Sequence, residues 1–453
     1  MQLRPVRSLD THGSAEKIHR ILEAAIESAD PVRAAARNLT LDRGQLAVEG
    51  TVLDLEKFNR IRLIGLGKAS VGMAQGALKV LGSRIRDGYL ISKHPQDEAS
   101  GLPDGIQLVQ GNHPVPGAGS LSAAQGLEAF LADTKPDDLV ICLISGGGSS
   151  LALLPAAGVS LEQLQELTRL LLASGASINE INALRKHLDR IKGGGLARMA
   201  APARLVTLIL SDVIGSPLDV IASGPTAADE STYADALGVL EKYGLLQEAP
   251  EQIVDMIRKG AAGELPETVK AGDTCLADGV HVVVGSNQVS AEAAVSQAEK
   301  EGYNTVLLTT SLQGEASDAG RMIAGVLHEI SRGGRPVPRP ACVVAGGETT
   351  VTLQGNGVGG RNTELALGAV EALAGLPDVM LVTLATDGED GTGDAAGAVV
   401  TGETLAAAQA AGLDPAAYLH NNDSFHFFQD LGDLLITGPT GTNVNDLVFL
   451  FAF

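Results

Sequence analysis

The sequence predicts an α/β protein with two domains, the first built on a Rossmann-like, mostly parallel sheet. Two observations lead to this prediction. Short apolar runs alternate with helical patterns along the chain, which is typical of α/β folds with a largely parallel sheet. The chain also has 453 residues, more than a single hydrophobic core usually serves. A helix and a polar connection are expected at 245–280, so we divide the chain into residues 1–270 and 271–453.

The first domain is expected to contain five strands, with helices between the last two. The strands are predicted at residues 61–66, 88–92, 106–110, 139–144 and 205–210. Ser160 and Gln163 are spaced as a capping box, which predicts a helix over 161–175. A second amphipathic helix is predicted over 178–191, where three glycines then stop it.

The second domain is expected to contain six strands. They are predicted at residues 281–286, 305–310, 341–348, 380–388, 434–438 and 446–453. Glycine-rich segments at 355–361 and 387–398 lie at strand ends and do not repeat. We therefore interpret them as loops of a binding site and not as linkers.

Composition excludes several classes of partner. The formal net charge is −21, and such a surface repels nucleic acid and anionic lipid, so we expect neither as a partner. The uncharged stretch 139–161 is long enough for a membrane span, but its central SGGGSS is a poor helix interior. The three cysteines form no CxxC pair and the N-terminus has no apolar signal region, so we expect a cytoplasmic protein with reduced thiols.

The segment 64-IGLGKASVGMA-74 indicates a strand, a tight turn and a helix start, and it nearly matches the dinucleotide fingerprint GxGxxG. Ser70 replaces the third glycine. The next strand ends in Ser92-Lys93-His94-Pro95, without the acid that would hold a nicotinamide ribose. What remains is Lys68 at a helix N-terminus, where a cation and free N–H groups favour an anion. An ordinary surface lysine is the alternative.

A glycine–serine run follows a strand that should be buried. Its residues are Ser145, Gly146, Gly147, Gly148, Ser149 and Ser150. Consecutive glycines let successive N–H groups point inward as an anion nest, and serine hydroxyls add donors. In a Rossmann-like strand order 3-2-1-4-5, the strands before Lys68 and before this run are neighbours where the order reverses. We therefore predict that the two loops flank one crevice that binds an anion.

Two further segments of the first domain carry charge. In 185-RKHLDRIKGGG-195, five of the first eight residues are basic. Most charge runs are solvated helix faces, but the ending at Lys192 and two glycines favours a contact with phosphate. Asp212 comes shortly after the strand 205–210, and ligands of open α/β sheets bind at this carboxyl end.

Charged residues also follow strands of the second domain. Glu348 and Asp387 lie at strand ends, and their carboxylates are hard-oxygen ligands suited to Mg²⁺. An Asp-Gly turn is the alternative role for Asp387. Arg361 follows two glycines, and its guanidinium can form a bidentate fork on a carboxylate or a phosphate.

Taken together, these segments resemble the class II glycerate kinases, a family of glycerate 2-kinases also called the MOFRL or TtuD-like family. The resemblance covers almost the whole chain. The motifs that carry it are GLGKAS, NHPVPG (112–117), SGGGSS, NALRKHLDRIKGGGLA, SDVIGSPLDVIASGPT, AGGETTV, GGRNTELAL, TDGEDGTGDAAGA, NDS and GPTGTNVNDL. The resemblance implies two α/β domains, the second smaller and with a mixed sheet, and an active site in the cleft between them.

The resemblance also implies transfer of the γ-phosphate of ATP to D-glycerate, usually at the 2-hydroxyl, with Mg²⁺ or another divalent cation. The family's cleft lysine and arginine correspond to Lys68 and Arg361, which we expect to bind substrate and to assist transfer. The loop from Ser145 to Ser149 would cradle phosphates, and the strand-end carboxylates of the second domain would hold the metal. Asp212 is the candidate for accepting the proton of the substrate hydroxyl. A homodimer is one possible assembly.

Two other functions fit parts of the sequence. A hydroxypyruvate reductase using NAD(P)H would bind its cofactor at Gly65-Leu66-Gly67, with Lys93 and His94 near an NADP phosphate. The absent acid after the second strand argues against it. A non-catalytic sensor of sugar phosphates on the same sheet would have no need of so many strand-end carboxylates.

Overall fold

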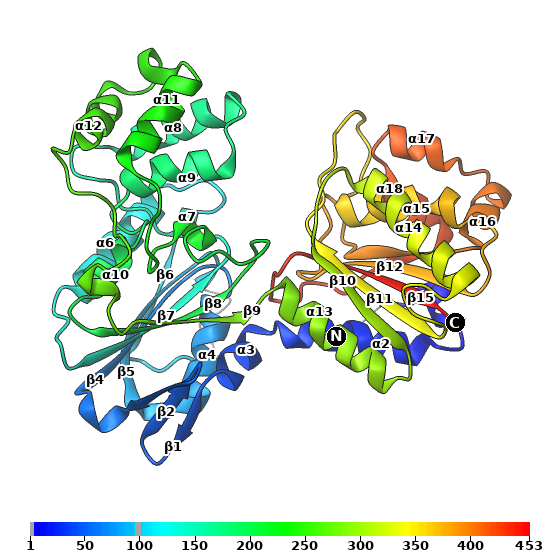
Figure 1. Ribbon diagram of the computed structural model, residues 1–453, viewed down its shortest axis with the longest axis horizontal. Coiled ribbons are helices and arrows are strands. Elements are labelled where there is room, and N and C mark those ends of the chain that lie inside the picture. The colour runs from blue at the N-terminus through cyan, green and yellow to red at the C-terminus, as the bar shows by residue number, and fades with distance from the viewer. Residues whose placement is uncertain (1–3, 96–100) are drawn as a thin grey trace. The chain divides into compact units, whose positions relative to one another are not determined.

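The computed structural model describes residues 4–95 and 101–453, which form two compact units (Figure 1). The N-terminal unit comprises Pro31–Ser211 and Ser216–Val284. The C-terminal unit comprises residues 4–30, Asp212–Gly215 and Gly285–Phe453. The chain passes between the two units more than once, and the division at residue 270 stays a prediction. No helix in the described ranges is long and apolar enough to cross a membrane.

The N-terminal unit is built on a six-stranded sheet with the order β6-β5-β4-β7-β8-β9. The strands are β4 (Arg60–Leu66), β5 (Ile85–Ser92), β6 (Ile106–Gln110), β7 (Asp138–Ser145), β8 (Arg204–Leu210) and β9 (Val280–Gly285). β4 pairs in parallel with β5 on one side and β7 on the other, and the β5–β6 and β7–β8 pairs are also parallel. The five predicted strands and their order 3-2-1-4-5 are confirmed.

One strand joins a different sheet from the one expected. The strand predicted at 281–286 for the second domain is β9, and it extends the sheet of the N-terminal unit beside β8. Its side chains mostly alternate between buried and half-buried, as in a strand with one well-covered face. This pattern predicts a strand but does not say which sheet it joins, so the predicted membership was wrong.

Smaller elements complete the frame of the N-terminal unit. They are α3 (Pro31–Arg37), α4 (Ser70–Leu81), α6 (Ala118–Leu131) and an antiparallel sheet of β1 (Thr40–Asp42), β2 (Gln45–Val48) and β3 (Thr51–Asp54). Sequence reasoning missed the small sheet because its strands have only three or four residues, too few for a clear alternation. α3 packs against α4, the helix that directly follows β4.

Six α-helices lie in the chain between β7 and β9 within the described residues. They are α7 (Gly148–Leu151), α8 (Leu161–Ala173), α9 (Ile178–His187), α10 (Gly195–Ala200), α11 (Tyr233–Lys242) and α12 (Glu251–Ala261). α8, α9, α11 and α12 share one apolar core (Figure 1). The predicted capping box of α8 is confirmed: the Gln163 N–H donates to Ser160 Oγ at 3.2 Å, and the Ser160 N–H donates to Gln163 Oε1 at 2.9 Å.

α9 is shorter than predicted, since it ends at His187 and not at Ile191. The carboxylate of Asp189 accepts the backbone N–H of Ile191 at 2.8 Å. The N–H of Arg190 donates to the carbonyl of Leu154 at 2.8 Å. A local side chain and a neighbouring segment thus take the backbone bonds that a further helical turn would need.

The C-terminal unit has a mixed sheet with the order β10-β11-β15-β12-β13-β14. Its strands are β10 (Asn304–Leu312), β11 (Ala341–Gly347), β12 (Val379–Ala385), β13 (Gly397–Thr401), β14 (Leu434–Leu435) and β15 (Asp446–Ala452). β10 and β11 are parallel, whereas β15 runs antiparallel to both of its neighbours. β13 was missed, because the glycine-rich segment that contains its start was interpreted as a loop.

Helices cover both faces of this sheet (Figure 1). α14 (Ala316–Gly333), α15 (Arg361–Leu373) and α18 (Ser424–Leu431) pack on one face. α2 (Ala15–Ser28) and α13 (Asn287–Lys300) pack on the other. The remaining helices are α1 (Arg7–Asp10), α16 (Thr404–Ala410) and α17 (Pro415–His420). The N-terminal helix α2 is therefore part of the core of the C-terminal unit.

Candidate active site

The loops after β4 and β7 meet in the N-terminal unit, as the strand order predicts. The backbone N–H of Lys68 donates to the carbonyl of Gly146 at 2.9 Å. The N–H of Ala69 donates to Ser145 Oγ at 3.0 Å, inside the protein. β4 and β7 are parallel neighbours, so both loops leave the sheet at the same edge and at the point where strand order reverses.

Two glycines permit this close approach. Gly67 has φ +132°, and a Cβ on it would lie 2.2 Å from Ser145 Oγ and 2.5 Å from the Ser145 carbonyl oxygen. Gly147 has φ +81°, and a Cβ there would lie 3.0 Å from His113 Cδ2 and 3.3 Å from Lys68 Cγ. Side chains at these positions would be strained and would push the two loops apart.

The hydroxyls of the SGGGSS loop already have partners within the protein. Ser145 Oγ accepts the Ala69 N–H, and Ser150 Oγ donates to the Gly147 carbonyl at 3.0 Å. Ser149 Oγ lies 3.0 Å from Ser223 Oγ. The backbone N–H groups at the start of α7 have no partners within their own helix. They are therefore the loop's main donors toward an anion.

Lys68 and His113 both lie close to Gly147. Lys68 is exposed, and His113 is half-buried. Burial lowers the pKa of His113 below its ordinary value, and the positive charges of Lys68 and Lys93 lower it further. The site therefore disfavours the charged form of this imidazole. His113 lies in the NHPVPG motif, but the sequence alone predicted no role for this histidine.

The basic run of 185–192 is not a solvated face. Lys192 Nζ lies 2.5 Å from Asp189 Oδ2, and both side chains are almost fully buried. Lys186 Nζ lies 3.1 Å from both Asp219 and Asp229. Burial lowers the pKa of Lys192 despite the charge of Asp189. The predicted contact of Lys192 with phosphate would involve an ammonium that already has a partner, and Asp189 is that unforeseen partner.

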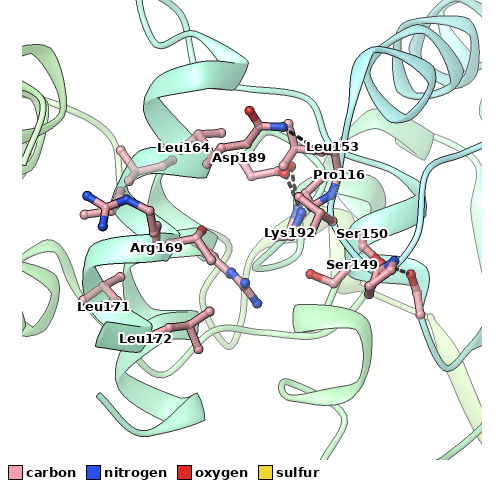
Figure 2. Close-up of a pocket in the computed structure, with 18 residues that line it drawn as sticks. Pro116, Ser149, Ser150, Leu153, Leu164, Arg169, Leu171, Leu172, Asp189 and Lys192 are labelled. Atoms are coloured by element: carbon pink, nitrogen blue, oxygen red, sulfur yellow. Dashed lines mark hydrogen bonds and ion pairs between the residues drawn. The ribbon is translucent and has the colours of Figure 1, made fainter. Parts of the chain in front are cut away.

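A cavity of about 530 Å³ lies beside the SGGGSS loop (Figure 2). Gly147, Ser149 and Ser150 form part of its wall. Figure 2 shows the leucines of α8 across the cavity from the two serines, and Lys192 directed at Asp189. The other lining residues are Pro114, Val115, Pro116, Leu153, Leu164, Gln165, Leu167, Thr168, Arg169, Leu171, Leu172, Arg185 and Leu188.

Arg361 is the centre of a second charged cluster, in the C-terminal unit. It begins α15, and its guanidinium lies 2.5 Å (Nε) and 3.2 Å (Nη2) from the carboxylate of Asp446 at the start of β15. Its Nη1 lies 3.0 Å from Glu348. Burial alone would lower the pKa of Arg361, but Asp446 and then Glu348 outweigh burial and raise it. Burial raises the pKa of Asp446 to about 6, although Arg361 acts against this.

The other acids near this sheet edge have structural partners. Asp387 accepts the side-chain amide of Asn443 at 3.1 Å and the N–H of Glu389 at 3.1 Å. Asp390 is buried and accepts the N–H of Thr363 at 2.8 Å, which caps the start of α15. In the part of the chain that the structure describes, no three His, Cys, Asp or Glu side chains gather closely enough to hold a metal by themselves.

Asp212 is half-buried and follows the end of β8 by two residues, in the short segment Asp212–Gly215 that groups with the C-terminal unit. It therefore lies at a strand's carboxyl end, as predicted. Its role as proton acceptor stays a prediction.

Comparisons with known proteins identify the family. Residues 17–258 match a domain of unknown function, DUF4147, and residues 341–446 match the MOFRL family. A D-glycerate 2-kinase from Thermotoga maritima is 44% identical over 402 residues, which is 89% of this chain and 93% of that relative. The chain belongs to the glycerate kinase family. A crystal structure of a glycerate kinase from Thermotoga maritima matches with a TM-score of 0.86 and 42% identity, over 97% of this chain and 99% of that one.

Some members of the glycerate kinase family have other names. A relative from Agrobacterium vitis, 40% identical over 95% of this chain and 92% of its own, has a hydroxypyruvate reductase name marked as provisional. In the present structure β5 ends at Ser92, and the described residues directly after it, Lys93, His94 and Pro95, include no acid. A nicotinamide site of the Rossmann type uses an acid near the end of this strand to hold the ribose.

Sequence reasoning missed two acids that complete the charged clusters of this glycerate kinase family member. Asp446 lies in the quoted GPTGTNVNDL motif, and Asp189 lies inside the basic run. A lone acid within a basic run, or directly before an apolar strand, is a usable signal. The Arg361–Asp446 pair joins residues 85 positions apart and forms only through tertiary packing. Asp189 and Lys192 are three residues apart, so their spacing was itself a usable signal.

Proposed function

We propose that this protein transfers the γ-phosphate of ATP to the 2-hydroxyl of D-glycerate and so forms 2-phosphoglycerate. The observation that carries the proposal is the 44% identity to a D-glycerate 2-kinase over most of both chains. The glycine-rich loop beside an exposed lysine supports it, because phosphoryl transfer depends mainly on positioning and on neutralising negative charge.

The N-terminal unit would bind the phosphates of the donor. Lys68 supplies a mobile ammonium, and the backbone from Gly146 to Ser149 supplies N–H donors. The lowered pKa of His113 favours the neutral imidazole, which can accept or donate a hydrogen bond beside the loop. Lys192, already paired with Asp189, would act on phosphate only if it exchanged that partner.

The C-terminal unit would hold the acceptor. The two carboxylates of Glu348 and Asp446 orient the Arg361 guanidinium, which can fork onto the glycerate carboxylate or the transferred phosphoryl group. Asp212 remains the proposed acceptor of the proton that leaves the substrate hydroxyl. A carboxylate in that role needs to reach within hydrogen-bond distance of the hydroxyl.

The divalent cation would enter with the nucleotide as MgATP. Magnesium in such sites keeps several waters and takes one or two carboxylates besides the phosphates. Asp387 can supply one carboxylate, while Glu348 would share its own with Arg361. Ion binding by Glu348 and Asp387 is thus proposed as assistance to a nucleotide-borne metal.

We further propose a cytoplasmic enzyme of small molecules that needs neither nucleic acid nor a membrane. The net charge of −21 supports this, since it opposes contact with both polyanions. A homodimer is the proposed assembly.

One assay tests the reaction. The protein is incubated with D-glycerate and MgATP, and the products are resolved by ³¹P NMR, which separates 2-phosphoglycerate from 3-phosphoglycerate. Parallel samples contain hydroxypyruvate with NADH or NADPH. We expect ADP and 2-phosphoglycerate in the first sample and constant absorbance in the others. Oxidation of NAD(P)H without phosphoglycerate would replace the kinase with the reductase.

Variants test the proposed roles of Lys68 and Arg361. Lys68→Ala and Arg361→Ala should each lower kcat by about 100-fold or more, because each removes charge stabilisation from the transition state. Matched controls are Lys79→Ala, an exposed lysine on α4, and Arg321→Ala, an exposed arginine on α14. Turnover near the wild-type value in Lys68→Ala or Arg361→Ala would remove that residue from the mechanism.

A further inference from the structure

We propose that the cavity beside the SGGGSS loop binds the nucleoside of the phosphate donor, with Arg185 on the α-phosphate. The enzyme would thereby select a nucleoside triphosphate over a polyphosphate that lacks a base. This inference rests on the proposed kinase function and adds to it the place where the base is held.

The walls of the cavity fit a flat apolar group and do not fit the acceptor. The volume of about 530 Å³ lies within the range of small-molecule sites, roughly 300–1,000 Å³. Half of the lining residues are leucine, valine or proline, mainly from α8 and from residues 114–116. Glycerate has three carbons with a carboxylate and two hydroxyls, so it would leave these walls without contacts. A nucleobase would cover them with its ring faces.

The cavity is continuous with the proposed phosphate loop. Gly147, Ser149 and Ser150 of the loop line it directly (Figure 2). A ligand that fills the apolar part can therefore extend a charged tail along the loop without leaving the cavity. A nucleotide has this combination of an apolar ring at one end and phosphates at the other.

Arg185 supplies a cation that the protein itself leaves unmatched. It lines the cavity from α9 and is half-buried. The neighbouring cations Lys186, Arg190 and Lys192 each pair with a carboxylate. Within residues 4–95 and 101–453, the guanidinium group of Arg185 makes neither a hydrogen bond nor an ion pair.

A half-buried guanidinium without a partner loses hydration without compensation. Burial lowers the pKa of Arg185, and the charge of Asp189 offsets this only in part. Asp189 is itself engaged by Lys192. A ligand phosphate in this cavity would supply the missing anion, and in a nucleotide the α-phosphate is the one beside the nucleoside.

Calorimetric titration of the full chain with ADP and with inorganic pyrophosphate tests the base site. We expect ADP to bind at least about tenfold tighter than pyrophosphate, because only ADP fills the cavity. Thr168 lines the cavity from α8, and Thr168→Trp should fill it. That variant should bind ADP no tighter than pyrophosphate, with pyrophosphate affinity unchanged. Equal affinities in the wild-type protein, or unchanged ADP binding in Thr168→Trp, would overturn the proposal.

Milder variants guard against a folding defect in Thr168→Trp. Leu172 lines the cavity yet is 63% exposed, so Leu172→Gln should leave the fold intact and weaken ADP binding about three- to tenfold. The matched control is Met322→Gln, because Met322 is 67% exposed and lines a separate cavity in the C-terminal unit. An equal effect of both variants on ADP affinity would contradict the assignment.

The proposed contact between Arg185 and the α-phosphate is tested separately, by comparing the binding of ADP with that of adenosine. Arg185→Ala should weaken binding of ADP but leave binding of adenosine unchanged, and Arg185→Lys should recover part of the ADP affinity. Weaker adenosine binding would place the guanidinium on the base and overturn the α-phosphate contact.

Failure of this inference differs from failure of the proposed function. If phosphoglycerate forms normally and Thr168→Trp leaves the KM for ATP unchanged, only the nucleoside site is lost. If no phosphoglycerate forms but Thr168→Trp still abolishes the preference for ADP, the kinase proposal fails and the nucleoside site stands.

Discussion

At the scale of single residues, the geometry of the candidate site depends on a few positions that have no room for a larger side chain. Gly67 is one of them, because its backbone lies against Ser145 and has φ +132°. The Gly67→Ala substitution should lower the free energy of unfolding by about 3 kcal/mol, from backbone strain and overpacking together. Urea denaturation measures this, with Gly238→Ala on α11 as control, since a Cβ there meets open space. If Gly67→Ala lowered the free energy of unfolding by no more than Gly238→Ala does, the loops after β4 and β7 would be able to move apart without cost.

Asp446 gives the enzyme a pH dependence with a defined sign. Its pKa is raised from 3.8 to about 6 by burial, so the carboxyl gains a proton and loses its charge as the pH falls below about 6. Arg361 then loses its bidentate partner, and kcat/KM for glycerate should fall. Asp446→Asn should show low activity without the inflection near pH 6. An inflection that persists in this variant would assign it to another group.

Stability should change in the opposite direction at the same residue. Between pH 3.8 and about 6, the folded protein holds a proton on Asp446 that the unfolded chain has released. This contribution to stability is fully present below pH 3.8 and is lost as the pH rises through about 6. As the pH falls through about 6, protonation of Asp446 should therefore lower activity and raise stability.

At the scale of elements, buried charge pairs fix the helices between β7 and β9 in place. Lys186 on α9 lies between Asp219 and Asp229. Burial raises the pKa of Asp229, but the charge of Lys186 together with hydrogen bonds from Ser231 and Thr268 outweighs it and holds that pKa below its ordinary value. Lys186→Met leaves Asp229 buried without its cation and should cost about 3–5 kcal/mol. Thermal or urea unfolding measures the loss.

The matched control is Lys242→Met on α11. The Lys242 side chain is 60% exposed and pairs with Glu180, and an exposed pair contributes only about 0–1 kcal/mol. Equal destabilisation by Lys186→Met and Lys242→Met would show that burial does not set the strength of these pairs.

The sequence predicted the positions of helices and strands better than it predicted which segments and side chains they contact. The buried strands β4, β7 and β8 are mainly apolar in sequence. Their order followed from the general topology of α/β sheets, which also placed Lys68 beside the SGGGSS loop. The sheet membership of β9 and the end of α9 depend on packing between distant segments, which periodicity does not contain. For the same reason, the sequence predicted that Arg361 can bind a carboxylate or phosphate with two hydrogen bonds, but it did not predict that Asp446 is the carboxylate it binds.

At the scale of the whole molecule, the first helices belong to the unit formed by the last third of the chain. Leu22 of α2 is completely buried in a core with α13 and β15. Leu22→Ala should destabilise the C-terminal unit by about 3 kcal/mol through the cavity it leaves. Hydrogen exchange should accelerate in α13 and β15 and stay unchanged in β4 and β7.

Leu353→Ala provides the control for this experiment, since Leu353 is in the same unit and 79% exposed. It should leave exchange unchanged throughout. Acceleration confined to β4 and β7 in Leu22→Ala would mean that α2 supports the other unit.

The packing of α2 on α13 and β15 also matters while the chain is being made. About 260 residues separate α2 from α13, so at roughly 5–20 residues per second α2 is made some 15–50 s before α13, and longer still before β15. During that time its apolar stripe is exposed, while the intervening unit can fold completely. The nascent chain would therefore expose the amphipathic segment of α2 until the C-terminal part of the chain folds onto it, and a chaperone could bind that segment in the meantime.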